Sequence, residues 1–330
     1  MTDQLTVGIA QIAPVWLNRD ATLAKIVDYT NQAADAGCQL VAFGEALLPG
    51  YPIWIDWTDG ARFDSPVQKR IHAHYVDQAV QIEAGHLRPL QQAAAKRSIA
   101  AYVGTVERAA DRGGHSIYCS LVYIDARGEI QSVHRKLMPT YQERMTWSTG
   151  DGHGLRTHGL GAFTVGGLNC WENWMPLPRA ALYALGEDLH VAVWPGGAHN
   201  TVETTRFLAR EGRSYVLAAS GLLRISDLPA DTPHLDIITA DMHAELADGI
   251  LSNGGSAMAG PDGQWMVEPV TGVEKLIVAT LDHLRVREER QNFDPAGHYS
   301  RPDVTKLTVD RRRQSTIEIV DAGGGCMRRL

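Results

Sequence analysis

The chain has 330 residues, of which 44% are hydrophobic and 21% charged, and 31 basic against 38 acidic residues give a net charge of −7. This composition excludes a disordered or collagen-like chain, and an acidic balance without a long basic stripe argues against a nucleic-acid partner. No stretch approaches the roughly 18 consecutive apolar residues that would span a bilayer. The first residues lack the cationic and apolar regions of a signal peptide. We therefore expect a globular cytoplasmic protein with no membrane partner.

Strand and helix patterns alternate along the chain. Leu5, Val7 and Ile9 alternate with less apolar neighbours, as in a half-buried strand. Ser65-Pro66 combines a helix cap with the first helical position, where proline is tolerated. In chain order, the predicted elements are a strand at 5–9, a helix between Asn18 and Gly37, a strand at 39–43, a helical region at 65–97 interrupted near Gly85, strands at 99–107, 117–124, 129–133 and 162–169, a helix at 176–185, a strand at 190–194, a helix at 201–218, and strands at 256–259 and 276–281.

This alternation is typical of a layered α/β fold. No repeat or linker divides the chain, so we expect one domain over residues 1–290 and a C-terminal extension over residues 291–330. The extension contains the run Arg311-Arg312-Arg313 and ends near Gly323-Gly324-Gly325. It is expected to be flexible or to lie at a subunit interface.

Three stretches place a reactive side chain at the end of a predicted strand, where α/β sheets bind ligands. These side chains are Glu45, Lys136 and Cys170. An ordinary thiol, with a pKa of ~8.5, is mostly protonated at neutral pH. A nearby lysine favours its thiolate, and a glutamate can take and return the proton. Each residue also has a plain structural interpretation, because lone buried cysteines are usually core residues and glutamates at strand ends are usually solvated or paired.

Together, the stretches resemble the Glu, Lys and Cys motifs of the nitrilase superfamily of carbon–nitrogen hydrolases. The run Cys170-Trp171-Glu172-Asn173-Trp174-Met175-Pro176 resembles the nucleophile segment of true nitrilases, and residues 134–140 resemble the lysine motif. Glu143 matches the second glutamate of the family. The sequence departs from the family at Gly44, where proline is common, at Leu47, where an aromatic residue is frequent, and at Asn169, where an aliphatic residue is common.

The resemblance implies a four-layer α-β-β-α sandwich and a nitrilase that converts an organic nitrile and water to a carboxylic acid and ammonia. Cys170 would form a covalent thioimidate and then a thioester, with Glu45 transferring protons. Lys136 and the backbone N–H of Trp171 would stabilise developing charge. Glu143 would orient Lys136, or form only an ion pair with it.

No cofactor and no metal are implied, and the 13 histidines contain no His-Glu-x-x-His pattern. The four cysteines, Cys38, Cys119, Cys170 and Cys326, form no Cys-x-x-Cys pair and are expected to be free thiols. The resemblance also implies a homo-oligomer built from dimers, with larger spirals or filaments possible. The alternatives are an amidase or carbamoylase, a cyanide-hydrolysing member of the superfamily, and an inactive scaffold homologue. The indoles of Trp171 and Trp174 are expected to crowd the approach to Cys170.

Overall fold

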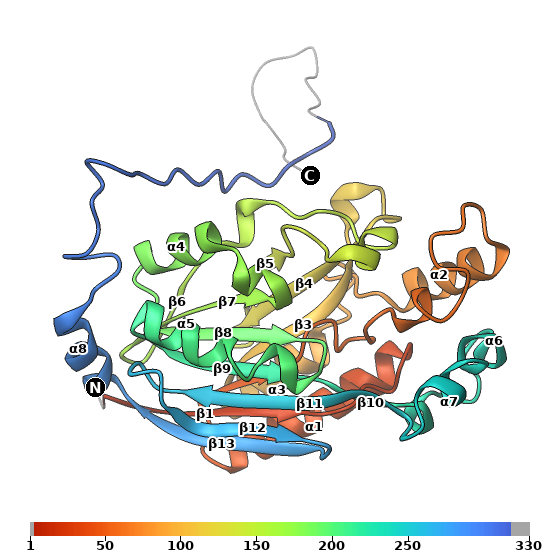
Figure 1. Cartoon of the computed structure of the whole chain (residues 1–330), viewed down its shortest axis with the longest axis horizontal. Coiled ribbons are helices and arrows are strands. Elements are labelled where there is room, and N and C mark those ends of the chain that lie inside the picture. The colour runs from red at the N-terminus through yellow and green to blue at the C-terminus, as the bar shows by residue number, and fades with distance from the viewer. Residues whose placement is uncertain (1–2, 318–330) are drawn as a thin grey trace.

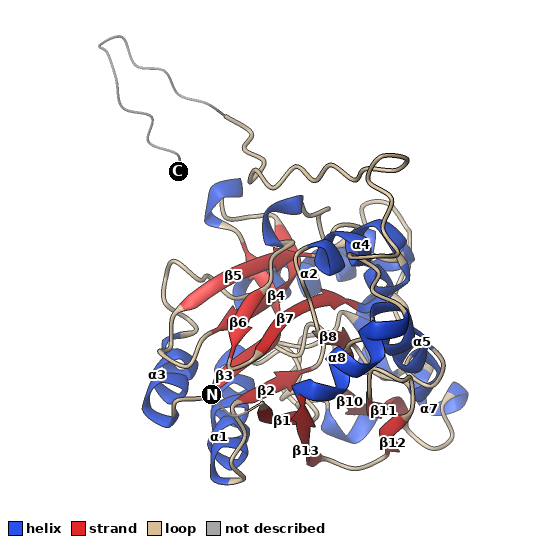
Figure 2. Cartoon of the chain, turned by 90° about the vertical axis from the view of Figure 1, so that its left-hand side faces the viewer, coloured by secondary structure: helices blue, strands red, loops and turns tan. Residues whose placement is uncertain are grey.

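Two β-sheets packed face to face form the centre of the protein, and helices cover their outer faces (Figures 1 and 2). The computed structural model describes residues 3–317; Gly323–Gly325 and Cys326 lie outside the described residues. Figure 2 shows α1 (Arg19–Asp35) and α3 (Arg88–Arg97) on one side of the sheets and α4 (Pro176–Ala184) and α5 (Thr204–Gly212) on the other. This arrangement confirms the predicted α-β-β-α sandwich.

The first sheet has six strands in the order β13-β1-β2-β3-β4-β5, and the neighbouring strands β1, β2 and β3 run parallel. Their bounds are β1 Gln4–Gln11, β2 Leu40–Phe43, β3 Ala100–Arg108, β4 Ile117–Ile124, β5 Ile130–Arg135 and β13 Lys275–Asp282.

The second sheet follows the order β10-β11-β9-β8-β7-β6, with β12 also paired to β11. Here β7, β8 and β9 are the parallel strands. The bounds are β6 His158–Leu160, β7 Phe163–Asn169, β8 Leu189–Trp194, β9 Tyr215–Ser220, β10 Leu222–Arg224, β11 Ile250–Ala259 and β12 Trp265–Thr271.

The main hydrophobic core lies between the sheets, because the inward-facing side chains of both meet there. Val7, Ala42 and Leu121 come from the first sheet, and Val165 and Val191 come from the second. A separate cluster joins α1 and α3 to the outer face of the first sheet. The two sheets are therefore fixed relative to each other, and so are the loops at their strand ends.

The prediction of one helix over residues 201–218 was wrong. Helix α5 ends at Gly212, Arg213 adopts the left-handed conformation with φ +48°, and β9 begins at Tyr215. Every residue of β9 is buried, because this strand lies between β8 and β11 inside the sheet. A strand buried on both faces has no polar alternation, so its pattern resembles a continuing apolar helix.

Short peripheral elements were also absent from the sequence prediction. The helical region at 65–97 was predicted correctly as two helices, α2 (Pro66–Gln78) and α3, separated around Gly85. The unpredicted elements are strands β6, β10 and β12 and helices α6 (Leu235–Thr239), α7 (Met242–Glu245) and α8 (His283–Asn292). Within residues 3–317, no helix is both long and apolar enough to cross a membrane.

After α8 the chain returns to the body of the protein in an extended course. The Arg313 guanidinium donates to Asp151 Oδ1 at 3.0 Å and to the Val133 carbonyl at 3.1 Å. The backbone N–H of Gln314 donates to Asp151 Oδ2 at 3.0 Å. The neighbouring Gly150 N–H donates to the carbonyl of Lys136 at 2.8 Å. This part of the extension thus packs beside the Lys136 segment.

Candidate active site

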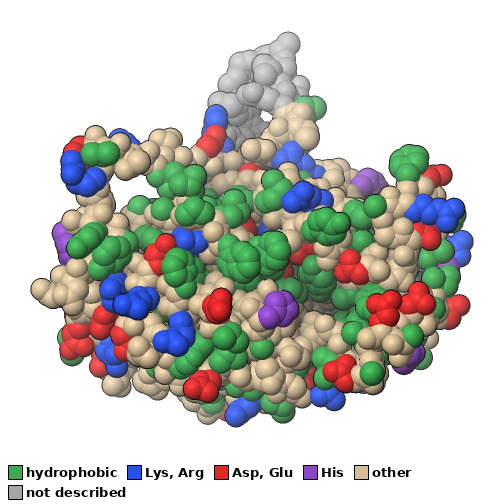
Figure 3. Space-filling view, in the orientation of Figure 1, with side chains coloured by type: hydrophobic (Ala, Val, Ile, Leu, Met, Phe, Trp, Pro, Cys, Tyr) green, Lys and Arg blue, Asp and Glu red, His purple; other side chains and the backbone are tan. Residues whose placement is uncertain are grey.

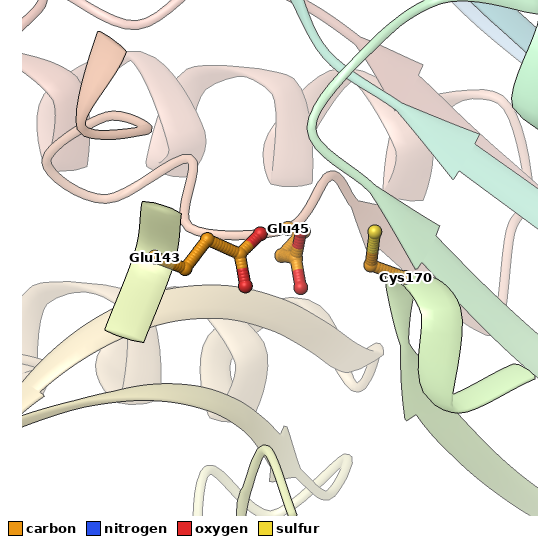
Figure 4. A group of neighbouring side chains, drawn as sticks. All are labelled: Glu45, Glu143 and Cys170. Carbon is orange, nitrogen blue, oxygen red and sulfur yellow. The ribbon is translucent and has the colours of Figure 1, made fainter. Parts of the chain in front are cut away.

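The three reactive side chains follow the ends of three strands, as the sequence predicted. Glu45 lies two residues after β2, Lys136 directly follows β5, and Cys170 directly follows β7. In Figure 4 the Glu143 side chain extends toward Glu45, and Cys170 lies on the other side of Glu45. One potential ligand atom from each residue lies within 4.8 Å of the other two. The structure therefore brings together residues that are up to 125 positions apart in the sequence.

Glu45 occupies a tight connection between the two sheets. Its backbone N–H donates to the Trp194 carbonyl at the end of β8 (3.1 Å). A Cβ atom at Gly104 would lie 2.1 Å from the Gly44 carbonyl oxygen, so only glycine fits beneath this loop. A Cβ at Gly44 would be 3.0 Å from the Trp194 carbonyl. Close backbone packing thus fixes the start of the Glu45 side chain.

Lys136 is fully buried and contacts both glutamates. Its Nζ lies 2.9 Å from Glu45 Oε1 and 2.7 Å from Glu143 Oε2. Glu143 is held in turn, because its Oε2 accepts from the Thr140 N–H (2.6 Å) and its Oε1 accepts from the Tyr51 hydroxyl (2.8 Å). Glu143 lies in the short 3₁₀ helix η3 (Tyr141–Met145) and forms a capping box with Thr140. The ammonium is therefore fixed by two carboxylates with independent supports.

Cys170 begins the short 3₁₀ helix η5 (Cys170–Trp174) in the left-handed conformation, with φ +47°. Non-glycine residues in this region are strained and often belong to functional sites. The Asn173 side-chain amide donates to the Cys170 carbonyl at 2.8 Å and to the Leu168 carbonyl at 3.2 Å. The backbone N–H of Trp171, the next residue, acts to lower the pKa of the Cys170 thiol. The thiol is thus presented at a sharp turn from strand to helix.

A buried carboxylate links the lysine and cysteine segments. Glu172 accepts from the Leu137 N–H at 2.6 Å and from the Asn169 N–H at 2.9 Å, and both of its oxygens lie 3.1 Å from His134 Nε2. Burial opposes ionisation of Glu172, but His134 and the two backbone donors hold its pKa below the usual value. One side chain therefore sets the spacing between the residues next to Lys136 and Cys170.

Burial is the largest influence on the pKa of Glu45 and of Cys170. It raises the pKa of Glu45 to about 7, against the opposing charge of Lys136 and with a further rise from Glu143. It also raises the pKa of the Cys170 thiol well above its usual value; Glu45 adds to this rise and Lys136 opposes it. For Lys136, burial acts to lower the pKa, but the nearby charges of Glu45, Cys170 and Glu143 outweigh it and the pKa is raised.

At neutral pH the site thus combines an ammonium group, a protonated thiol and a carboxyl group near its own pKa. Lys136 favours the thiolate, as the sequence analysis expected, but burial of the sulfur has the larger effect on the pKa of Cys170. The thiol needs a base, and a carboxyl group with a pKa of about 7 can both accept and return a proton. Glu45 meets this requirement by its contacts and by its pKa.

The same side chains provide cation-ligating atoms. Glu45, Glu143 and Cys170 converge closely enough to hold a metal ion. The Lys136 ammonium, however, already lies within 2.9 Å of both carboxylates. A fixed positive charge at this point competes with a metal ion for the same oxygens. The arrangement therefore fits a lysine-centred site.

A small pocket beside Glu45 is lined mainly by aliphatic residues, including Leu47, Ile53 and Leu222. The expected crowding by Trp171 and Trp174 is not found. Their indole rings stack on each other with centroids 5.1 Å apart, and the residues are 47% and 52% exposed. About half of each tryptophan is thus exposed at the surface, while Cys170 is buried.

Several side chains at the site were missed by sequence reasoning. Tyr51 was not singled out, because its bond to Glu143 spans 92 residues and has no local signal. Asn173 was read as part of the cysteine motif without a contact of its own. Cys119, considered only as a free thiol, lies with its sulfur 3.5 Å from Glu45 Oε1. The bonds of Asn173 to Cys170 and Leu168 are local, whereas the contacts of Tyr51 and Cys119 join segments that are distant in the sequence.

Comparison with known proteins places this geometry in a family. The carbon–nitrogen hydrolase model matches residues 6–291. An aliphatic nitrilase of Rhodococcus rhodochrous is 34% identical, over 98% of this chain and 84% of the relative. A protein named nitrilase 2, from an unknown prokaryotic organism, is 37% identical over 96% of both chains.

The fold likeness extends to solved structures. A carbon–nitrogen hydrolase from Helicobacter pylori superposes with a TM-score of 0.67 at 18% identity, covering 91% of this chain and 96% of that one. The match at this identity concerns the fold, and the sequence matches carry the assignment. The chain belongs to the carbon–nitrogen hydrolase family, the nitrilase superfamily that its glutamate, lysine and cysteine motifs predicted.

Proposed function

We propose that this protein is a nitrilase that converts an organic nitrile and two water molecules to a carboxylic acid and ammonia. The observation that carries the proposal is the contact of buried Lys136 with Glu45 and Glu143 beside the Cys170 thiol. Its relatives' names, nitrilase and aliphatic nitrilase, support the nitrile as substrate. In this proposal Glu45, Lys136, Cys170 and Glu143 are catalytic residues.

The first step forms a bond between sulfur and carbon. Glu45 takes the thiol proton, and the Cys170 sulfur attacks the nitrile carbon. One electron pair of the carbon–nitrogen triple bond moves to nitrogen, which takes up the proton. The product is a covalent thioimidate. Lys136 and the Trp171 N–H, both of which act to lower the pKa of the Cys170 thiol, stabilise the negative charge that develops on the substrate nitrogen.

Water then attacks the thioimidate carbon, with Glu45 accepting a proton from the water. The carbon–nitrogen bond breaks and the protonated nitrogen leaves as ammonia, so that a thioester remains. A second water molecule attacks the thioester, the carbon–sulfur bond breaks, and the carboxylic acid leaves with the Cys170 thiol restored. The reaction consumes two waters and no electrons, and it draws only on groups of this chain, with no cofactor.

Glu143 keeps Lys136 fixed through the 2.7 Å contact and leaves an excess of negative charge around the ammonium. This arrangement supports a role in orienting Lys136 and in proton transfer. Burying a thiol, an ammonium and two carboxylates at one point lowers the stability of the fold. Such a cost is expected where the groups perform a reaction. It therefore speaks against an inactive scaffold.

Paired substrates test the nitrile assignment. For nitriles and amides that share one side chain, we expect kcat/KM for the nitrile to exceed that for the amide by about 10-fold or more, a difference of ~1.4 kcal/mol in transition-state binding. The nitrile nitrogen must gain protons before it leaves, and Glu45, Lys136 and Glu143 surround the thiol with proton-carrying groups. Ammonia release over a panel of side chains is the measurement.

The same assay separates the alternatives. A consistent preference for amides would make the protein an amidase or carbamoylase, and accumulation of amide from nitriles would indicate an incomplete, hydratase-like reaction. Turnover of cyanide alone would indicate a cyanide-hydrolysing enzyme. No ammonia from any of these substrates would support the inactive scaffold.

We also propose that residues 1–290 form the catalytic domain and that the protein assembles as a homo-oligomer built from dimers. Exposed apolar side chains from η5, α4 and α5 are the candidate interface. We call them the tryptophan patch: Trp171, Trp174, Leu177 and Phe207, which are 47–63% exposed. Figure 3 shows hydrophobic side chains gathered on this face over α4 and α5. Exposed apolar patches of this kind are typical of protein interfaces. A second copy of the chain is the proposed partner.

Replacing Leu177 with aspartate should shift the protein to a smaller particle, because a charge would have to be desolvated at the interface. Light scattering coupled to gel filtration measures the mass. Phe63→Asp is the matched control, since Phe63 is 95% exposed and lies outside the patch. An unchanged mass for Leu177→Asp would place the interface elsewhere.

The proposed compartment is the cytoplasm. Cys38, Cys119 and Cys170 are free and buried. Free thiols are typical of a reducing compartment. The proposed nucleophile itself requires its thiol to remain reduced.

A further inference from the structure

Cys119 is a second buried thiol at the active site, and the reaction proposed above gives it no role. It lies on β4 and is completely buried. Its carbonyl accepts from the backbone N–H of Lys136 at 2.7 Å. Its sulfur lies 3.5 Å from Glu45 Oε1 and 3.9 Å from Asn169 Oδ1. The Cys119 side chain therefore lies between the proposed base, Glu45, and Asn169, the residue before the proposed nucleophile.

The thiol has one proton and two possible acceptors. Asn169 Oδ1 already accepts the Glu172 N–H in the capping box that begins η5. Glu45 Oε1 is nearer to the sulfur, and it carries negative charge when Glu45 is ionised. A hydrogen bond to a charged acceptor is the stronger of the two. The Cys119 thiol thus donates to Glu45 whenever Glu45 can act as a base.

The two oxygens of Glu45 have different surroundings. Oε1 contacts Lys136 Nζ at 2.9 Å and the Cys119 sulfur at 3.5 Å. Oε2 is buried and has no hydrogen-bond partner among residues 3–317. An unpartnered oxygen in a buried carboxylate is costly unless a substrate, water or reacting group uses it. It is also the more available base, since neither of its lone pairs is engaged.

We propose that Cys119 is a positioning residue for Glu45: with Lys136 it holds Oε1, so that Oε2 is the oxygen that takes the proton from Cys170. This inference rests on the proposed function, in which Glu45 is the base. The proposal explains why a side chain that can donate a hydrogen bond to Glu45 lies at this position of β4, where a small apolar side chain would also fill the space.

The inference predicts a change in pH dependence. Four titratable groups from neighbouring elements surround Glu45: Lys136 after β5, Glu143 in η3, Cys170 in η5 and Cys119 on β4. The hydroxyls of Tyr51 and Tyr75 are also near, and the charge of Glu45 raises the pKa of both. Donation by the Cys119 thiol favours the ionised form of Glu45 and lowers its pKa. Loss of this donor raises that pKa, so the acid limb of kcat/KM moves to higher pH.

The experiment compares Cys119→Ala, which removes the donor, with Cys119→Ser, which keeps a hydroxyl donor on the same strand. For Cys119→Ala we expect the acid limb to rise by about 0.5–1 pH unit, the range of one hydrogen bond to a carboxylate. For Cys119→Ser we expect a limb close to that of the unmodified protein. Cys38→Ala is the matched control, because Cys38 is also a buried free thiol but packs with Gly8 and α1.

Thermal unfolding of each variant first shows which ones are folded at the assay temperature. An acid limb that is the same in Cys119→Ala and Cys38→Ala would overturn the inference. An equal rise in Cys119→Ser and Cys119→Ala would overturn it too, because the effect would then come from side-chain volume. Glu45→Gln distinguishes failure of this inference from failure of the proposed function. Normal turnover by Glu45→Gln would overturn the proposed function. An inactive Glu45→Gln, together with an unchanged acid limb in Cys119→Ala, would overturn only the role of Cys119.

Discussion

Replacing Cys170 with alanine should reduce ammonia release from nitriles by about 10⁴-fold or more, the scale on which loss of a nucleophile affects covalent catalysis. Without sulfur no thioimidate can form, and neither Glu45 nor Lys136 offers a substitute at the same place. The change removes one buried atom, so the folded state should lose only about 1 kcal/mol. Steady-state ammonia release and thermal unfolding measure the two effects separately.

The intermediate provides an independent measurement. Acid-quenched wild-type protein should carry the mass of the acyl group on the peptide that contains Cys170, and Cys170→Ala should carry none. Cys38→Ala, Cys119→Ala and the corresponding change at Cys326 should still turn over substrate. Normal turnover by Cys170→Ala, together with its loss in another cysteine variant, would show that the nucleophile had been assigned to the wrong residue.

The candidate catalytic side chains could be singled out from the sequence because each follows a predicted strand. β2 and β7, before Glu45 and Cys170, are largely buried parallel strands, and parallel sheets collect such strand ends at one edge. β5, before Lys136, is an antiparallel edge strand that is buried only at its last two residues. The order and the residues of the three motifs indicated the type of reaction through their resemblance to the nitrilase superfamily. Neither source specifies which atoms touch, and the contacts of Tyr51 and Cys119 with the glutamates appear only after distant segments have paired.

Asn169 shows how a departure from the family pattern can be explained by the structure. Its side chain accepts the Glu172 N–H, and its own N–H donates to the Glu172 carboxylate, so the pair caps the turn that holds Cys170. The residue spacing of this capping box was visible in the sequence. The prediction nevertheless treated the segment only as a nucleophile motif. Local capping therefore explains a residue that the family comparison presented as an exception.

The errors in the fold have a different physical origin. β9 is completely buried, so its residues do not alternate between polar and apolar, and α5 leads into it through only two residues. The indoles of Trp171 and Trp174 illustrate the same limit at side-chain level. Their positions beside Cys170 in the sequence suggested a crowded approach to the thiol, but the two rings stack on each other and are about half exposed. Cys170 itself adopts a left-handed turn. Sequence periodicity contains no information about that turn.

Glu45→Gln should reduce kcat/KM by at least about 10²-fold above pH 7, where the wild-type carboxylate is ionised; this is the scale of general acid–base catalysis. Glutamine has nearly the same shape, and its amide oxygen can still face Lys136, but it cannot accept a proton from a thiol whose own pKa is raised by burial. The variant should therefore remain folded and bind substrate. Stopped assays of ammonia release, with unfolding as the control for structure, make the comparison.

The pKa of Glu45 also predicts the direction in which activity changes with pH. Because burial raises the pKa of Glu45 to about 7, the wild-type carboxyl group is protonated at lower pH and cannot act as a base, so activity should fall as the pH drops below about 7. Above that value the carboxylate is available, while Lys136, whose pKa is raised, keeps its charge. In Glu45→Gln this acid limb should disappear along with the rate. A variant that kept the wild-type limb would assign the titration to another group, and Glu143, the second carboxylate on Lys136, would then be the residue to replace.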